Sequence, residues 1–303
     1  MTLRDHMPQA PIREAVLDLL WSAWDELGVP GLQRTHRRLV SDPEPLIVFT
    51  PALAIDDPRL LEQAAAWCER YGDSVSKTRL DGLQRRAPHD VGSAFIAFAG
   101  PLGGAAADWG EVKGPRIPLS VGRATTPPLE RPALARLRMR ALAGTGTRAD
   151  VLCELIGSGN TWTSATDLER LGYARRSIAR VLGDLSAARL TSEKSGKGAA
   201  SYRLRDARAL AGLIEAEDLK WPDWAALLTL AWHLVQLESA TPPSVALAPV
   251  KVRDVWDELR RLSVAVGLRE PPISTGDLTA WRSLLNWGST VLRLWPVDSP
   301  ATK

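Results

Sequence analysis

The sequence predicts a mainly α-helical protein with one small β-hairpin. Apolar residues recur at three- and four-residue spacing over most of the 303 residues, which is typical of amphipathic helices. Strand-like runs are short and lie near residue 200, and a Gly- and Pro-rich stretch interrupts the helical pattern. We therefore expect a helical N-terminal domain over 1–104, a linker over 105–132, a central domain over 133–208 and a C-terminal helical domain over 209–303.

The N-terminal domain carries two well-marked helices. Residues 12–28 place apolar side chains on one face, and Gly28 is a stop signal. A second helix begins with Asp57 as N-cap and Pro58 in the first turn. The apolar run LIVFTPALAI between them is too short and too Pro-interrupted to assign.

The C-terminal domain is predicted to be a bundle of three amphipathic helices, over 223–238, 252–268 and 277–295. Seven of the chain's 12 Trp residues lie in the last 85 residues, on or beside the apolar stripes. They are interpreted either as helix–helix core or as a face that dimerises or docks a protein partner.

The central segment 163–205 predicts a helix, a tight turn, a second helix and a two-stranded hairpin. Ser164 and Asp167 have the spacing of a capping box, and Gly172 ends the short helix in a left-handed conformation. The second helix, 174–188, has an apolar stripe from Ile178 to Leu185.

The opposite face of this second helix is slim and positive. Arg176 and Arg180 lie there with Gly183, while Arg175 and Ser177 flank them near the N-terminal end. A major groove about 12 Å wide admits a helix of this profile. The face therefore predicts contact with a DNA duplex.

The hairpin adds further cations. Lys194, Lys197, Arg203 and Arg205 lie on or beside the turn SGKG, where a loop can follow the sugar-phosphate backbone. Residues 131–208 contain 15 Lys+Arg and 7 Asp+Glu, a net charge of +8, whereas the remainder carries −5. This uneven charge indicates a localised anionic partner.

Residues 133–206 resemble the winged helix-turn-helix domains of bacterial transcription regulators, through RRSIARVLGDLSAARLTSEKSGKGAASYRL. The resemblance implies that Arg175, Arg176, Ser177 and Arg180 read or clamp DNA and that Lys194 and Lys197 lie on the wing. The flanks faintly resemble actinobacterial proteins associated with toxin–antitoxin or abortive-infection systems, through LLWSAWDELGVPG and WCERYGDSVSKTRLDGL. In winged helix-turn-helix regulators the motif usually lies near the N-terminus, whereas in this sequence it lies mid-chain.

Residues 73–86 predict a basic helix with Lys77, Arg79, Arg85 and Arg86, interpreted as a solvated face or as a second helix-turn-helix. Asp and Glu alternate with Lys and Arg elsewhere, which predicts solvated helix faces. Cys68 and Cys153 lie in apolar helical patterns and are expected to be small core residues in a reducing compartment.

No enzyme is expected. The four His residues lack metal spacing, the Gly-rich pieces lack the ending of a P-loop, and no nucleophile elbow is present. We expect no metal, cofactor or catalytic residue. With no apolar leader at the N-terminus and no bilayer-length apolar run, a cytoplasmic protein without a membrane partner is predicted.

The sequence therefore predicts a transcription regulator that binds double-stranded DNA as a homodimer. The alternative is an interaction subunit, antitoxin-like or part of a defence complex, whose winged helix and Trp-rich helices bind a protein.

Overall fold

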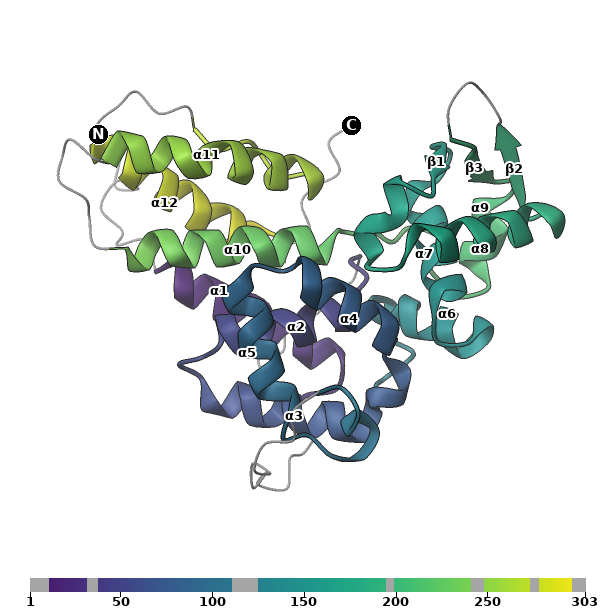
Figure 1. Ribbon diagram of the computed structural model, residues 1–303, viewed down its shortest axis with the longest axis horizontal. Helices are drawn as coiled ribbons and strands as arrows, with labels where there is room; N and C mark the ends of the chain where they lie inside the picture. The colour runs from purple at the N-terminus through teal and green to yellow at the C-terminus, as the bar shows by residue number, and fades with distance from the viewer. Residues whose placement is uncertain are drawn as a thin grey trace.

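We describe the chain from a computed structural model over residues 11–31, 38–110, 125–194, 199–240, 248–272 and 278–295. It is mainly helical, with one small antiparallel sheet (Figure 1). The all-helical part contains α1 (Ile12–Glu26), α2 (Pro43–Leu53), α3 (Pro58–Tyr71), α4 (Lys77–Arg86), α5 (His89–Ala99), α10 (Trp224–Ser239), α11 (Ala248–Ala265) and α12 (Leu278–Leu294). The sheet-bearing part contains α6 (Ala135–Ala143), α7 (Thr147–Ser158), β1 (Thr163–Ser164), the 3₁₀ helix η5 (Asp167–Leu171), α8 (Arg175–Ala187), β2 (Thr191–Lys194), β3 (Ser201–Leu204) and α9 (Ala207–Gly212).

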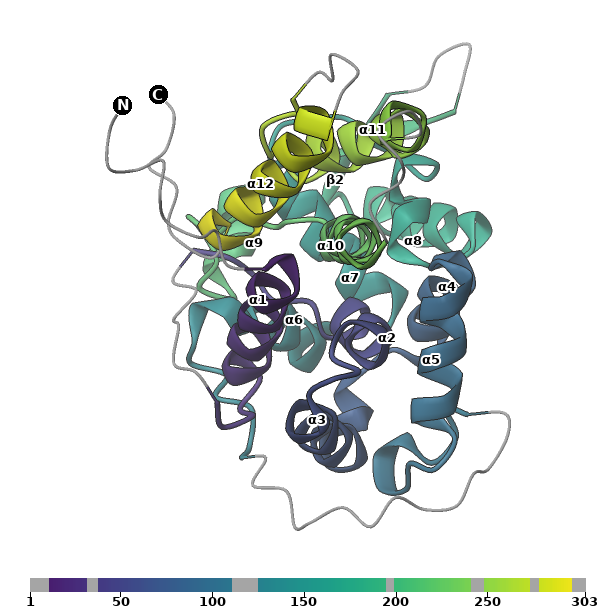
Figure 2. The same cartoon turned by 90° about the vertical axis from the view of Figure 1, so that its left-hand side faces the viewer.

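The centre of the all-helical part is α2, the run that the sequence pattern could not assign. Nearly every residue of α2 is buried, and a helix that is apolar on all sides shows no amphipathic period. Pro51 falls in its last turn, where the helix ends at Leu53. In Figure 2, α10 lies over α2, with α1 and α12 on one side and α4 and α5 on the other.

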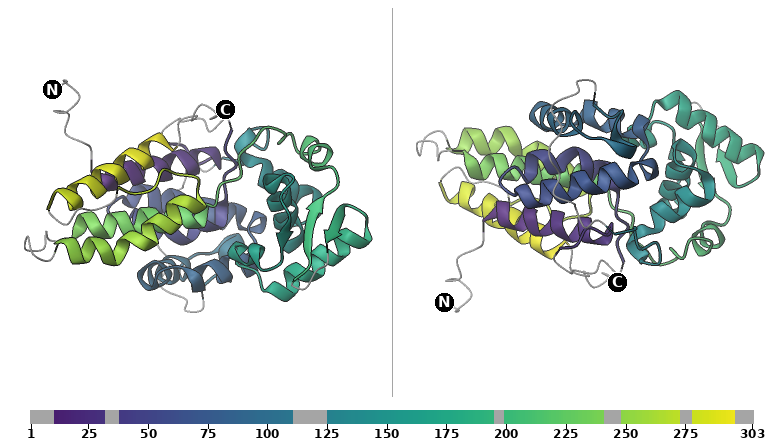
Figure 3. Two further views of the ribbon diagram at one scale, coloured as in Figure 1. Left: turned by 90° about the horizontal axis from the view of Figure 1, so that it is seen from above. Right: turned by 90° about the horizontal axis from the view of Figure 1, so that it is seen from below.

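The N-terminal and C-terminal helices share one hydrophobic core. Trp24, Trp67 and Trp224 are fully buried in it, and their indole N–H groups donate to Thr50 Oγ1, to the Leu27 carbonyl and to the Val40 carbonyl at 2.7–2.9 Å. The domain boundaries expected from the sequence remain a prediction. The packing adds that the two flanking helical regions fold against each other, as Figure 3 shows from above and below.

The sheet-bearing part has a second core, formed mainly by α7, α8 and the residues around them. Its sheet order is β1-β3-β2, with Thr163 opposite Tyr202 and Thr191 opposite Leu204. The expected hairpin is present as β2 and β3, and β1 extends it to a three-stranded sheet that the sequence did not predict, because two residues are too short to show alternation. Much of the expected linker, 111–124, lies outside the described residues.

The two parts meet through close backbone contacts. A Cβ built at Gly82 of α4 would lie 1.7 Å from the carbonyl oxygen of Gly172, in the turn between η5 and α8. On another side, the Lys220 N–H donates to the Arg38 carbonyl at 2.7 Å and the Val40 N–H donates to the Lys220 carbonyl at 2.9 Å. The turn before α8 therefore packs directly against α4.

Two glycine substitutions are expected to change stability in opposite directions. Gly82→Ala should lower the free energy of unfolding by about 1–3 kcal/mol, because its methyl group must displace the Gly172 backbone. Gly183→Ala, in open space on α8, should raise it by about 1 kcal/mol through helix propensity. Urea unfolding of both variants checks this, and equal effects would contradict the close approach of α4 to the turn.

Candidate nucleic-acid interface

The exposed face of α8 carries the arginines singled out from the sequence. Arg175, Arg176 and Arg180 are exposed, and among the described residues their side chains have no hydrogen-bond or ion-pair partner. The apolar stripe, Ile178 to Leu185, is buried as expected. Ser177 is half-buried at the edge of the face. Arg176 and Arg180 on this face, and Arg175 beside it, are thus free within the described residues to contact an anion.

Residues directly before α8 fix the position at which this helix begins. The Ser164 N–H and hydroxyl both donate to Asp167 Oδ2 at 2.8 Å, and the Asp167 N–H donates to Ser164 Oγ at 3.3 Å, which confirms the capping box. The helix that it opens, η5, is a 3₁₀ helix instead of the expected α-helix. Gly172 ends it at φ +97°, the left-handed conformation expected there.

The hairpin brings two of its expected cations to the same part of the molecule. Lys194 is exposed at the end of β2, and Lys197 lies outside the described residues. Arg203 of β3 is half-buried, with its guanidinium carbon 4.9 Å from the centroid of the Trp162 ring. Trp162, which the sequence interpretation did not select, is itself partly exposed at 36%. The available signal was a Trp within the polar run GSGNTWTS.

A hollow of about 490 Å³ lies beside Arg180, between the start of α7 and α8. Its walls are the loop 144–147, Arg148, Arg180 and Asp184. Gly146 is the N-cap of α7 and supplies no side-chain acceptor to the first-turn N–H groups. Arg148 and Asp184 were not selected from the sequence. They face each other at 3.6 Å, so part of the charge of Arg148 is balanced.

Behind the arginine face lies a buried ion cluster that joins the two parts of the chain. It comprises Asp42, Glu44, Arg79, Arg136, Arg140, Asp150 and Glu154, with side chains no more than 5% exposed. The half-exposed Arg170 contacts Glu154 as a fourth guanidinium, which balances the four carboxylates. The expectation that charged residues form solvated faces is wrong for these positions.

Asp150 is the centre of the cluster. It accepts from Arg136 at 3.0 Å, from Arg140 at 2.9 Å and from the Tyr173 hydroxyl at 2.6 Å. Arg79 joins the parts, since it donates to Asp42, to Glu44 and to the Leu171 carbonyl. The Tyr173 hydroxyl also lies 2.8 Å from Ser76 Oγ. The turn before α8 is therefore held by α4 and α7 together.

The cluster keeps its carboxylates ionised. Burial alone would raise the pKa of Asp150, but Arg140, Arg79 and Arg136 outweigh it and hold that pKa below its ordinary value. The pKa of Asp42 is lowered in the same way, with burial opposed first by Arg136 and then by Arg79. Burial and the charge of Asp150 raise the pKa of Tyr173, so its hydroxyl stays a donor.

This electrostatic arrangement predicts acid sensitivity. A carboxyl whose folded-state pKa is lowered contributes stability in full above its unfolded value, about 3.9, and loses it as pH falls through the lower folded-state value. We expect the urea concentration at the unfolding midpoint to decrease once the pH is lowered below about 4, because Asp42 and Asp150 then take up protons. Urea titrations from neutral to acidic pH measure this, and Asp42→Asn should flatten the curve. An identical pH profile in that variant would contradict the assignment.

The basic segment 73–86 is only partly a solvated face. Arg79 is buried in the ion cluster, and Lys77 pairs with Asp108 at 2.7 Å. Arg86 donates to the Glu169 carbonyl, and Arg85 is exposed.

The cysteines, histidines and helices of the described ranges offer no further site. Cys68 and Cys153 are buried free thiols, as expected, and burial raises the pKa of both. Among the residues whose placement is described, His, Cys, Asp and Glu form no group of three or more that could hold a metal ion. Within the same ranges, every helix is too short or too polar to cross a bilayer.

The chain was compared with known proteins by family, by sequence and by structure. No family model, no curated protein and no solved structure matches it. The function must therefore be argued from the chain's own residues and geometry.

Proposed function

We propose that this protein binds double-stranded DNA through a winged helix-turn-helix formed by α7, η5, α8 and the three-stranded sheet, and that it acts as a transcription regulator. The observation that carries the proposal is the exposed arginine face of α8, whose side chains have no partner among the described residues. Arg176 and Arg180 are assigned to the major groove, because Gly183 and the Ala residues beside them keep the helix slim. Arg175 and Ser177 flank them at the helix start.

The surroundings of α8 support contacts with the sugar-phosphate backbone. Lys194 is placed on the wing, and Lys197 belongs to the same proposed contact. Gly146, Thr147 and Arg148, at the start of α7, line the hollow beside Arg180, and this helix start with its cation suits a phosphate. Arg203, whose guanidinium lies over the Trp162 ring, is assigned to the same DNA contact as Lys194.

A homodimer is part of this proposal, because one winged helix reads few base pairs and two-fold repetition is the usual route to specificity. The alternative, a protein partner on the C-terminal helices, has less support. Trp224 and Trp281 are buried, and Trp232, Trp287 and Trp295 pack against the chain's own core. Trp221 packs against the second core, so six of the seven Trp side chains that suggested a docking face contact the chain's own cores, and Trp256 is half-buried outside both cores.

The test is a fluorescence anisotropy titration of the purified protein. One duplex carries DNA from upstream of its own coding region, and a shuffled duplex of equal length and composition is the control, each at two salt concentrations. We expect tighter binding to the first duplex and a log–log salt slope of about −0.9 for each phosphate neutralised. Weak binding that is equal on both duplexes would reject sequence-specific regulation. A salt slope near zero would reject the arginine face as the contact surface.

A further inference from the structure

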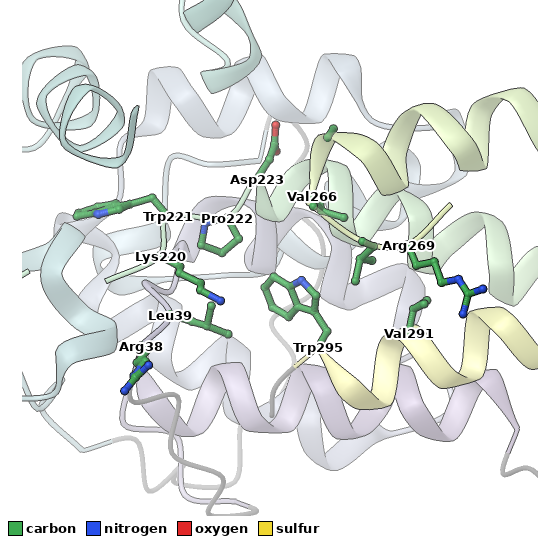
Figure 4. A pocket seen from close by; sticks show the side chains of 13 residues that line it. Arg38, Leu39, Lys220, Trp221, Pro222, Asp223, Val266, Arg269, Val291 and Trp295 are labelled. Carbon is green, nitrogen blue, oxygen red and sulfur yellow. The ribbon is translucent and has the colours of Figure 1, made fainter. Parts of the chain in front are cut away.

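A cleft of about 540 Å³ opens where the two parts of the chain meet. Its volume falls in the range of small-molecule sites, about 300–1,000 Å³. Figure 4 shows that its walls come from segments far apart in sequence: the loop before α2, residues 220–223, the end of α11 with the residues after it, and the end of α12. It lies apart from the arginine face of α8 and has no role in the proposed DNA contact.

One wall of the cleft is apolar. Leu39, Val266, Leu268, Val291 and Trp295 contribute to it. The Trp295 ring packs edge-on against Trp224, with centroids 5.0 Å apart and planes at 82°, so its orientation is fixed by the core. Trp295 is half-buried and therefore offers part of its indole surface to the cleft.

The rest of the lining is mainly cationic. Arg38, Lys220 and Arg269 are exposed, and within the described part of the chain their side chains have no partner. In Figure 4 the Lys220 side chain extends toward the Trp295 indole, while Arg38 and Arg269 lie at opposite ends of the cleft. Two backbone hydrogen bonds hold the main chain of Lys220 in place, so the point from which its side chain extends is fixed.

Among the described residues that line the cleft, the one carboxylate is Asp223, and it has its own partners. Its Oδ1 accepts from the Ala226 N–H at 3.0 Å as the N-cap of α10, and its Oδ2 lies 3.6 Å from Arg170. It therefore neutralises none of the three cations that face the cleft. Cations beside an apolar wall suit a ligand that has an acid group on an apolar body.

We propose that this cleft binds a small organic anion with an aromatic or apolar body. The acid group lies on Lys220 Nζ and the body lies against Trp295. This ligand site goes beyond the proposed DNA binding and does not depend on it.

The test is a calorimetric titration of the full chain, without DNA, using 1-naphthoate as the anionic probe and 1-naphthamide as its neutral counterpart. We expect saturable binding of naphthoate, and binding of the amide at least about tenfold weaker, since a charge-assisted hydrogen bond is lost. Lys220→Gln should raise the Kd for naphthoate about tenfold, whereas Lys220→Arg should restore binding to within about threefold.

Arg253→Gln is the matched control, because Arg253 is an exposed cation on α11 outside the cleft. It should leave the Kd for naphthoate unchanged. Equal affinity for the acid and the amide, an unchanged Kd in Lys220→Gln, or no binding of naphthoate at about 1 mM would each overturn the proposal. Because no DNA is present, failure of the DNA-binding proposal leaves this result fully interpretable.

Discussion

Asp150→Ala is expected to lower the free energy of unfolding by about 3–5 kcal/mol, the largest effect of any single substitution considered. The substitution leaves Arg136 and Arg140 buried with fewer counter-charges, and it removes the acceptor of the Tyr173 hydroxyl. A buried charge that loses its partner keeps its full desolvation cost. Urea unfolding followed by circular dichroism measures the change.

Glu270→Ala is the control for that experiment. Glu270 pairs with Arg260 at 3.0 Å, but both side chains are about half exposed. Solvent screens such a pair, so the loss should stay below about 1 kcal/mol. If Asp150→Ala and Glu270→Ala lowered the free energy of unfolding by similar amounts, the ion cluster would not be what stabilises the contact between the two parts of the chain.

Arg176→Ala is expected to weaken binding to a cognate duplex by about 1–3 kcal/mol and to relax sequence preference at one position. The side chain is exposed and lacks a partner within the described ranges, so its removal should leave the fold intact. Lys194→Ala, on the proposed wing, should instead weaken all sequences similarly and reduce the salt slope by about one. Anisotropy titrations on cognate and shuffled duplexes separate the two effects.

The matched control is Arg282→Ala; Arg282 is an exposed cation on α12, a helix that lies at the other end of the molecule from α8 in Figure 1. Its affinity for both duplexes should equal that of the unchanged protein. If Arg176→Ala and Lys194→Ala also left both affinities unchanged, the assigned surface would be wrong.

Sequence reasoning was most successful where the chain is locally determined. The capping box at Ser164 and Asp167, the left-handed Gly172 and the buried stripe of α8 each depend on residues a few positions apart. The interactions that determine these features lie within one turn or one helix, so the local sequence pattern is enough to predict them. The arginine face follows from the same helical period.

The parts that were missed depend on contacts between distant segments. Asp42, Arg79 and Asp150 look like surface charges in the sequence, because the partners that balance them lie on other elements. One signal was present: Arg136 with Arg140, and Asp150 with Glu154, each lie four residues apart on helices that are otherwise largely apolar. The small cleft around Lys220 likewise has no sequence signature, since its walls come from four segments.

For the proposed DNA binding, the close contact of Gly172 with Gly82 has a consequence for the arrangement of DNA sites. Because α4, the buried ion cluster and the backbone hydrogen bonds at Lys220 hold the turn before α8 against the all-helical part, the arginine face has a fixed position relative to that part within the described residues. In a two-fold assembly, the distance between half-sites is then set by protein geometry. Adding five base pairs, about half a helical turn, would rotate the second half-site to the far side of the duplex and disengage one copy.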